Sequence, residues 1–333
     1  MKRILLLTTG GTIVSRESAV GRVSEYTGGD LVRDIPELAG LCEIQIHDIM
    51  KIDSTNMQPE DWKVIAKEAY KGLQLFDGIV ITHGTDTMAF TSAMLSFMLK
   101  NLNKPVVFTG SQLSIDEPNT DAKKNLVDAV KTAVAGYPGA YIVFGGKIIK
   151  GTRACKTHST DFGAFESINA PLAGKIVDDK VCMENPLSKS AGETTLEMGA
   201  DNPGYPGVFL LKITPGTNPK VIDEIIKMDD YRGIVIEAYG IGGVPNARRD
   251  LIEPIKRAIN ANMSVVVVTQ CRHGITDLTR YEVGISALKE GVITVDNMTT
   301  EAAVTKLMWL LDQLSDPQEI KQRMQENLCG EIG

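Results

Sequence analysis

Two threonines stand where apolar segments of the chain end in glycine-containing turns. Residues 5–13 read LLLTTGGTI and carry Thr12 directly after two glycines. Residues 78–87 read GIVITHGTDT and carry Thr85 and Asp86 just after a glycine. Glycine permits a tight turn and a close approach of the backbone to a ligand. Because a hydroxyl becomes a nucleophile once a neighbouring base takes its proton, the two turns predict a small reaction pocket.

Three more polar segments follow apolar runs in the same way. DSTNM occupies residues 53–57, TGSQ occupies residues 109–112, and RACK occupies residues 153–156. A single lysine is usually solvated, but partial burial lowers the pKa of lysine, so Lys156 is a candidate base. The convergence of these loops points to a site more strongly than any one motif does.

Alternative interpretations of these motifs remain. Asp86 is a favoured residue type for capping the helix that follows it, and the loop at residues 53–57 precedes a helix in the same manner. The glycines at residues 10–11 fit neither G-x-G-x-x-G nor GxxxxGK[ST], which disfavours a phosphate loop.

The stretch after Thr12 has no helical period. Residues 14–29 read VSRESAVGRVSEYTGG. A connection of this length without structure of its own is typically a lid or a disordered segment. We therefore predict a lid over Thr12.

Strand-like and helix-like segments alternate along the chain. The predicted strands are residues 4–7, 43–49, 77–82, 105–109, 140–144, 208–213, 233–238, 264–269 and 292–295. One predicted helix begins near residue 58, and another follows the strand at 77–82 and ends near residue 99. Four more are predicted at residues 121–135, 222–227, 247–260 and 300–314. This order predicts an α/β fold with a doubly wound, mostly parallel sheet.

The composition changes at residues 183–206, which are rich in Gly, Pro, Ser and Asn and read as part edge hairpin and part linker. The predicted organisation is a large N-terminal catalytic α/β domain at residues 1–185, a linker at 186–206 and a second, smaller α/β domain at 207–333.

Bulk properties favour a cytoplasmic protein. The net charge is −7 and no basic stripe is present, which argues against a nucleic-acid partner. No apolar window approaches the roughly 18 residues of a membrane span. The five cysteines are scattered without CxxC spacing, so we expect free thiols, and we expect no metal site.

Taken together, TTGGTI, DSTNM, HGTDTM, VVFTGSQ and RACK resemble the bacterial L-asparaginases. The resemblance extends over essentially the whole chain, including YGIGGVP at residues 239–245. TQC at residues 269–271 and the absence of a signal peptide make the chain similar to the cytoplasmic, type I branch.

The resemblance implies hydrolysis of L-asparagine to L-aspartate and ammonia without a cofactor. By motif, Thr12 is the expected nucleophile, and Thr85, Asp86 and Lys156 are the expected second hydroxyl, carboxylate and base. The substrate is expected to meet further residues, which are Gly11, Ser54 and Thr55, together with Thr85 and Asp86.

The resemblance also implies roles for Tyr26 and Glu282, although the sequence around Tyr26 departs from the family pattern. Tyr26 is the only tyrosine of the lid, but it lies further along than the usual spacing, and Arg22 stands nearer to that spacing. Glu282 is the candidate for a glutamate that reaches the site from the partner subunit. The resemblance also implies a homodimer or homotetramer, and cytoplasmic relatives can carry a regulatory asparagine site.

Two other functions stay open at this stage. One is a non-catalytic asparagine or aspartate binder, and the other is the asparaginase-like subunit of a tRNA-dependent amidotransferase. Selectivity between asparagine and glutamine is also open, because one methylene changes binding by only about 1–3 kcal/mol.

Overall fold

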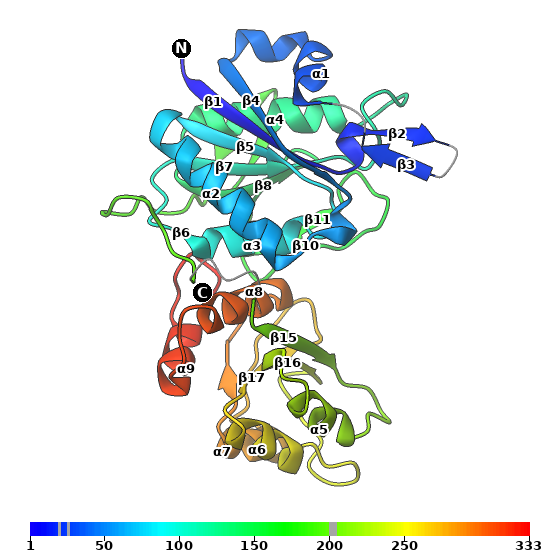
Figure 1. The fold of residues 1–333 in the computed structure, drawn as a ribbon, viewed down its shortest axis with the longest axis vertical. Coiled ribbons are helices and arrows are strands. Elements are labelled where there is room, and N and C mark those ends of the chain that lie inside the picture. Colours follow the sequence, from blue (N-terminus) through cyan, green and yellow to red (C-terminus); the bar gives the residue numbers. More distant parts are fainter. Residues whose placement is uncertain (19–20, 25–26, 200–204) are drawn as a thin grey trace. The chain divides into compact units, whose positions relative to one another are not determined.

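The computed structural model describes residues 1–18, 21–24, 27–199 and 205–333. Contacts divide the chain into two units, Met1–Glu197 and Met198–Gly333 (Figure 1). The first unit contains a large, mostly parallel sheet, and the second contains a smaller parallel sheet. The predicted α/β fold class with two such parts is therefore confirmed.

The first unit is built on an eight-stranded sheet with the order β13-β12-β9-β8-β7-β5-β1-β4. The strands from β8 to β4 are parallel, and β9, β12 and β13 continue the sheet antiparallel. Their bounds are β1 Arg3–Gly10, β4 Glu43–Ile52, β5 Gly78–Thr82, β7 Pro105–Thr109, β8 Gly139–Phe144, β9 Lys147–Lys150, β12 Gly174–Val177 and β13 Lys180–Met183. The central strands are buried along their whole length, as expected for a parallel sheet covered on both faces.

Helices cover both faces of this sheet (Figure 1). On one face, α4 (Ala122–Ala135) packs into a core that includes Ile4, Val80 and Val107. On the other face lies α2 (Pro59–Leu75), whose Gly72 sits against the side chains of Leu5 and Ile79. The helix α3 (Met88–Met98) follows β5 and is almost completely buried.

The connection after Thr12 differs from the predicted structureless loop. β2 (Ser15–Ser18) and β3 (Gly21–Ser24) pair antiparallel, and α1 (Gly28–Arg33) follows. Each of these two strands has only four residues, so the alternation of polar and apolar residues along them was too short to predict strands from the sequence.

The predicted edge hairpin lies earlier than residues 183–206. It is formed by β12 and β13 at residues 174–183. Within the predicted linker, β14 (Thr195–Leu196) pairs with β6 (Leu99–Lys100), so this part of the chain belongs to the first unit. Two further short strands, β10 (Ala154–Lys156) and β11 (Phe165–Ser167), form their own antiparallel pair.

The second unit has a four-stranded parallel sheet in the order β15-β16-β17-β18. Its elements are β15 Gly207–Lys212, α5 Lys220–Ile226, β16 Tyr231–Ala238, α6 Ile252–Asn260, β17 Ser264–Thr269, α7 Glu282–Glu290, β18 Ile293–Thr294, α8 Thr300–Leu311 and α9 Pro317–Gln325. The helix predicted from residue 247 begins only at Ile252, because residues 247–250 form a turn in which Arg249 has a positive φ of 55°.

A buried ion pair fastens the C-terminal segment of the second unit. Lys306 of α8 lies 2.7 Å from Glu331, and neither side chain is exposed. The Lys306 ammonium also donates to the carbonyl oxygens of Met324 and Glu326. The carboxylate of Glu331 accepts the N–H of Leu328, so the ends of this segment are held by polar contacts inside the unit.

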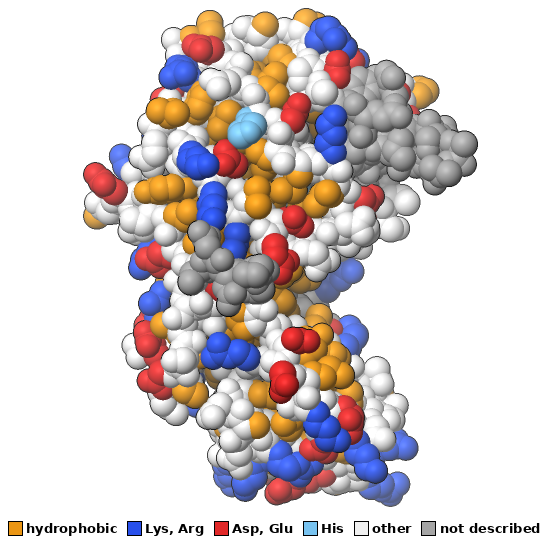
Figure 2. Space-filling view, viewed as in Figure 1, with side chains coloured by type: hydrophobic (Ala, Val, Ile, Leu, Met, Phe, Trp, Pro, Cys, Tyr) orange, Lys and Arg blue, Asp and Glu red, His pale blue; other side chains and the backbone are white. Residues whose placement is uncertain are grey.

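On the face drawn in Figure 2, basic and acidic side chains are interspersed over the described surface. No helix within the described residues is long and apolar enough to cross a membrane.

Candidate active site

The candidate site lies at the carboxyl ends of four adjacent strands. In the sheet, β7, β5, β1 and β4 are neighbours, and each is followed by one of the polar loops identified in the sequence. In parallel sheets, ligands bind in the crevice beyond these strand ends. The topology therefore brings four loops to one edge, although they lie far apart along the chain.

The first loop makes a sharp exit that requires glycine. Gly10 and Gly11 have φ values of 108° and 83°, and the Gly11 N–H donates to the Ile52 carbonyl at 3.1 Å. A Cβ on Gly11 would lie 2.4 Å from the backbone nitrogen of Gly84. Thr12 follows at once, half-buried, at the start of a 3-10 helix. The loop carrying Thr12 thus packs directly against the loop carrying Thr85.

The Ser54 loop closes the other side of Gly84. A Cβ on Gly84 would lie 2.5 Å from Ser54 Oγ, and Ser54 itself is buried. Ser54 Oγ accepts the Asp86 N–H at 3.3 Å, and the Ser54 carbonyl accepts the Thr87 hydroxyl at 2.7 Å. Three loops are therefore in contact around one glycine, which leaves no space for a side chain there.

Lys156 joins the cluster from β10, outside the large sheet. Its Nζ donates to Thr85 Oγ1 and to Asp86 Oδ1, each at 2.7 Å. The Lys156 side chain is 16% exposed and that of Asp86 is 54% exposed. Thr85 is buried beside them. A hydroxyl, an ammonium group and a carboxylate in contact provide a route for proton movement and an exposed carboxylate face for a cationic group.

Asp86 does not cap the helix after it. The N-cap of α3 is Thr87, without a side-chain cap bond, whereas the Asp86 carboxylate pairs with Lys156. By contrast, Asp53 does cap locally, because it accepts both the N–H and the hydroxyl of Thr55. The Thr55 hydroxyl is thus engaged within its own loop.

Gln112 is a contact of the cluster that the motifs did not single out for a role. Thr85 Oγ1 donates to Gln112 Oε1 at 3.4 Å. The Gln112 amide donates to the carbonyls of Ser159 and Asp161 at 3.1 Å each. Gln112 therefore links Thr85 to the segment just after Lys156. Its position in the TGSQ loop at the end of a strand was the feature of the sequence that could have predicted this contact.

A buried neutral chain of hydrogen bonds lies beneath the Thr85 loop. Trp62 Nε1 donates to Thr91 Oγ1, the Thr91 hydroxyl lies 2.9 Å from His83 Nε2, and His83 Nδ1 lies 2.7 Å from the Gly84 carbonyl. A carbonyl only accepts, so Nδ1 carries the proton and Nε2 accepts from Thr91. Burial lowers the pKa of His83 to about 4, which keeps the ring neutral. The sequence offered no sign that His83 is a support.

The contacts described for this cluster involve neither of two other expected residues. Tyr26 lies outside the described residues. Glu282 is exposed at the start of α7 and belongs to the second unit.

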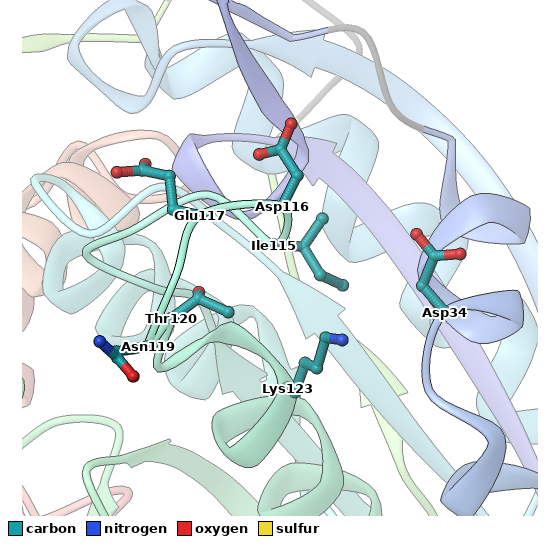
Figure 3. A pocket seen from close by; sticks show the side chains of 7 residues that line it. All are labelled: Asp34, Ile115, Asp116, Glu117, Asn119, Thr120 and Lys123. Atoms are coloured by element: carbon teal, nitrogen blue, oxygen red, sulfur yellow. The ribbon is translucent and has the colours of Figure 1, made fainter.

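A cavity of about 540 Å³ opens beyond the loop that follows β7 (Figure 3). Carboxylates of Asp34, Asp116 and Glu117 and the ammonium of Lys123 line it. None of the expected catalytic side chains is among its lining residues, so it is separate from the Thr85 and Lys156 cluster.

A two-unit α/β fold with hydroxyl, lysine and carboxylate groups gathered at strand ends defines a class of proteins equipped for nucleophilic attack by a side-chain hydroxyl. Comparison with known proteins is more specific. Residues 3–189 match the family described as "Asparaginase, N-terminal", and residues 207–324 match the "Glutaminase/Asparaginase C-terminal domain". The chain therefore belongs to the asparaginase family of enzymes.

Individual relatives agree with this family. The chain is 43% identical to an L-asparaginase of the archaeon Thermococcus kodakarensis, with 99% of each chain covered. A solved structure of the thermostable L-asparaginase from that organism superposes with a TM-score of 0.91 at 41% identity, covering 99% of each chain. The structure of L-asparaginase I from Vibrio cholerae gives a TM-score of 0.87 at 30% identity and covers 100% of this chain and 99% of that one.

The chain also resembles a second kind of protein. It is 38% identical to a subunit of the glutamyl-tRNA(Gln) amidotransferase of Thermococcus kodakarensis, over 99% of this chain and 76% of that one. The relatives are both archaeal and bacterial, so the bacterial origin suggested by the sequence motifs does not follow from them.

Proposed function

We propose that the chain hydrolyses L-asparagine to L-aspartate and ammonia, with Thr12 as the nucleophile. The observation that carries this proposal is the position of Lys156 Nζ, which lies 2.7 Å from both Thr85 Oγ1 and Asp86 Oδ1. The loop that carries Thr85 and Asp86 packs against the Thr12 turn. The full-length identity to an L-asparaginase supports the same reaction.

In the proposed reaction, Thr12 Oγ attacks the side-chain amide carbon of the substrate and gives up its proton. The C–N bond of the tetrahedral intermediate breaks, ammonia leaves with a proton, and an ester on Thr12 remains. Water then attacks the ester carbon and releases aspartate. Backbone N–H groups at such glycine turns are suited to hold the oxyanion, each donor contributing about 3–4 kcal/mol.

The second set of groups acts on protons and on the substrate charges. Thr85, hydrogen-bonded to Lys156, takes part in proton movement, and Lys156 is the proposed base. Asp86 pairs with the α-ammonium group of the substrate through its exposed oxygen, and Ser54 orients the α-carboxylate. Gly11 shapes the wall of the site. Tyr26 and Glu282 are also proposed to take part, the latter as a contribution from a partner subunit.

The tests are ammonia release from L-asparagine and its loss in Thr12→Ala and Thr85→Ala. Full ammonia release by Thr12→Ala would end the nucleophile assignment. Binding of L-asparagine in a calorimeter without any turnover would instead favour a non-catalytic binder. Initial rates against L-asparagine and L-glutamine over a concentration series would give the selectivity.

The amidotransferase alternative is favoured by one observation, the 38% identity to a component of such an enzyme. An amidotransferase passes an amide nitrogen to an acceptor, whereas the proposed enzyme turns over L-asparagine alone. Steady turnover of L-asparagine by the purified chain supports the asparaginase proposal. Negligible turnover that rises only with added protein and tRNA would support the alternative. The homo-oligomeric state and the cytoplasmic location are part of the proposal, and sedimentation analysis would test the first.

A further inference from the structure

A second cavity lies in the second unit, at the carboxyl ends of β15 and β16. Its volume is about 580 Å³. Residues of the loop after β15 and of the long loop after β16 line it, including Thr214, Thr217, Tyr239, Arg248 and Arg249. Both strands belong to a parallel sheet, and this edge is where open α/β sheets bind ligands.

The two arginines are held on a defined turn rather than on a free chain. The Leu251 N–H donates to the Pro245 carbonyl at 2.9 Å and closes the turn, and Leu251 is fully buried. Arg249 has a φ of 55°. Opposite it, Gly216 has a φ of 107°, and a Cβ there would lie 3.7 Å from a guanidinium nitrogen of Arg249. The Arg249 head group therefore lies over the turn at residues 214–217.

The charges in this cavity are uncompensated. Of the arginine side chains that the structure describes, Arg248 and Arg249 are the two without a hydrogen-bond, ion-pair or ring partner there. Elsewhere in the same unit, Arg257 makes two bonds to Asp223 at 2.8 and 3.0 Å. Among the described residues that line the cavity, none is a carboxylate. Two adjacent, permanently charged groups thus face a cavity in a protein of net charge −7.

We propose that this cavity binds a small molecule bearing a carboxylate or phosphate group. A guanidinium group presents a planar fork of donors that matches either anion with two parallel hydrogen bonds. The hydroxyls of Thr214 and Thr217 and the phenol of Tyr239 supply further polar contacts. A volume near 580 Å³ lies within the range of about 300–1,000 Å³ that small-molecule sites occupy. None of the residues that line this cavity has been assigned a role in the proposed reaction.

The test is calorimetric titration of the full chain with two probes, inorganic phosphate and succinate, in a buffer free of other multivalent anions. We expect one of them, or both, to bind with a stoichiometry near one per chain. The double variant Arg248→Gln/Arg249→Gln is expected to weaken that binding at least tenfold, and a tenfold loss corresponds to about 1.4 kcal/mol. Binding of phosphate alone would assign a phosphate group to the ligand, and binding of succinate alone would assign a carboxylate.

Two controls separate the cavity from general attraction of anions. Arg257→Gln also removes a positive charge from the second unit and is expected to leave binding unchanged. Arg248→Lys/Arg249→Lys keeps both charges but loses the planar fork, and we expect binding between that of the wild type and the double Gln variant. Binding of neither probe, or equal binding by the wild type and the double Gln variant with an unchanged unfolding temperature, would overturn the proposal.

Discussion

Each unit contains a lysine–carboxylate pair with the same separation and a different environment. Lys156 and Asp86 are 2.7 Å apart in the first unit, and Lys306 and Glu331 are 2.7 Å apart in the second. The first pair has side chains 16% and 54% exposed, whereas both side chains of the second pair are fully buried. Distance alone therefore says little about what such a pair does.

The neighbours of each pair explain the difference. Backbone groups saturate the buried pair, because Lys306 donates to two carbonyls and Glu331 accepts from two N–H groups. Besides Asp86, the partner of Lys156 is instead the hydroxyl of Thr85, and the Asp86 side chain remains partly exposed. A fully buried pair with all its polar atoms satisfied stabilises structure, while a pair that contacts a hydroxyl group and opens to solvent is available for chemistry.

The largest expected effect is on the open pair. Lys156→Met should lower turnover by about 10²–10⁴-fold, because general acid–base help of this size is lost. Its unfolding free energy should change by no more than about 1 kcal/mol, since a partly exposed pair contributes little. Ammonia release and urea unfolding measure the two quantities. Lys131→Met is the matched control, because Lys131 is 19% exposed and pairs with Asp179 at 3.1 Å, away from the site. Normal turnover in Lys156→Met would remove the role proposed for Lys156.

The sealed pair should respond in the opposite way. Glu331→Gln or Lys306→Met is expected to lower the unfolding free energy by about 3–5 kcal/mol, because one buried charge loses its partner. Burial already lowers the pKa of Lys306, which is consistent with this cost. Turnover per folded molecule should stay near that of the wild type. Urea unfolding followed by an activity assay at low temperature checks both. A variant with unchanged stability would show that solvent reaches the pair, and the comparison between the two units would fail.

The neutral chain of hydrogen bonds beneath the Thr85 loop gives a third difference, which depends on pH. The pKa of His83 is about 4 in the folded chain, against 6.5 for an unperturbed histidine, so the unfolded chain binds the proton first as the pH falls. The stabilisation is complete above pH 6.5 and is lost between pH 6.5 and about 4, by about 3 kcal/mol in total. The measurement is urea unfolding over this range for the wild type and for His83→Gln, which has no titrating ring. An identical pH dependence of the two proteins would contradict the assignment of a neutral His83.

The fold and the candidate site residues could be predicted from the sequence on different physical grounds. Buried parallel strands are nearly continuous apolar runs, so β1, β5, β7 and β8 were predicted within a few residues, as β7 at residues 105–109 shows. The loops after these strands are short, so Thr12 and Thr85 could be selected by residue type and motif. Lys156, which lies on β10 outside this sheet, was selected by its motif.

The features that sequence reasoning missed depend on contacts distant along the chain. His83 reads as an ordinary histidine until Thr91 and Trp62 are seen beside it. Lys306 and Glu331 are 25 residues apart in segments that share no sequence motif, so the local sequence did not predict that they would pair. The arginine turn after β16 was predicted as helix, because Ala247 and the residues after it have adequate helical propensity, while the closing bond to Pro245 is visible only in the structure.

The smallest expected effect compares one helix cap from each unit. Thr27 caps α1 and Thr299 caps α8, each through a threonine side chain that accepts a backbone N–H. Thr27→Ala and Thr299→Ala should each lower the unfolding free energy by about 1 kcal/mol in urea at neutral pH. The two caps differ in charge, because the backbone and side chain of Thr27 also donate to Asp30 and lower the pKa of that carboxyl to about 2.

That difference separates the two caps by titration. With its pKa lowered, Asp30 contributes stability above pH 3.8 that disappears as the pH falls from 3.8 towards 2. The Asp30 carboxyl of the wild type should therefore stay ionised down to the lowest pH at which the chain is folded, and in Thr27→Ala it should titrate closer to 3.8. The Thr299→Ala variant should leave the Asp30 titration unchanged. Observation of the Asp30 carboxyl carbon by NMR in the three proteins checks this, and a normal titration of Asp30 in the wild type would show that the cap in the first unit is no more electrostatic than the one in the second.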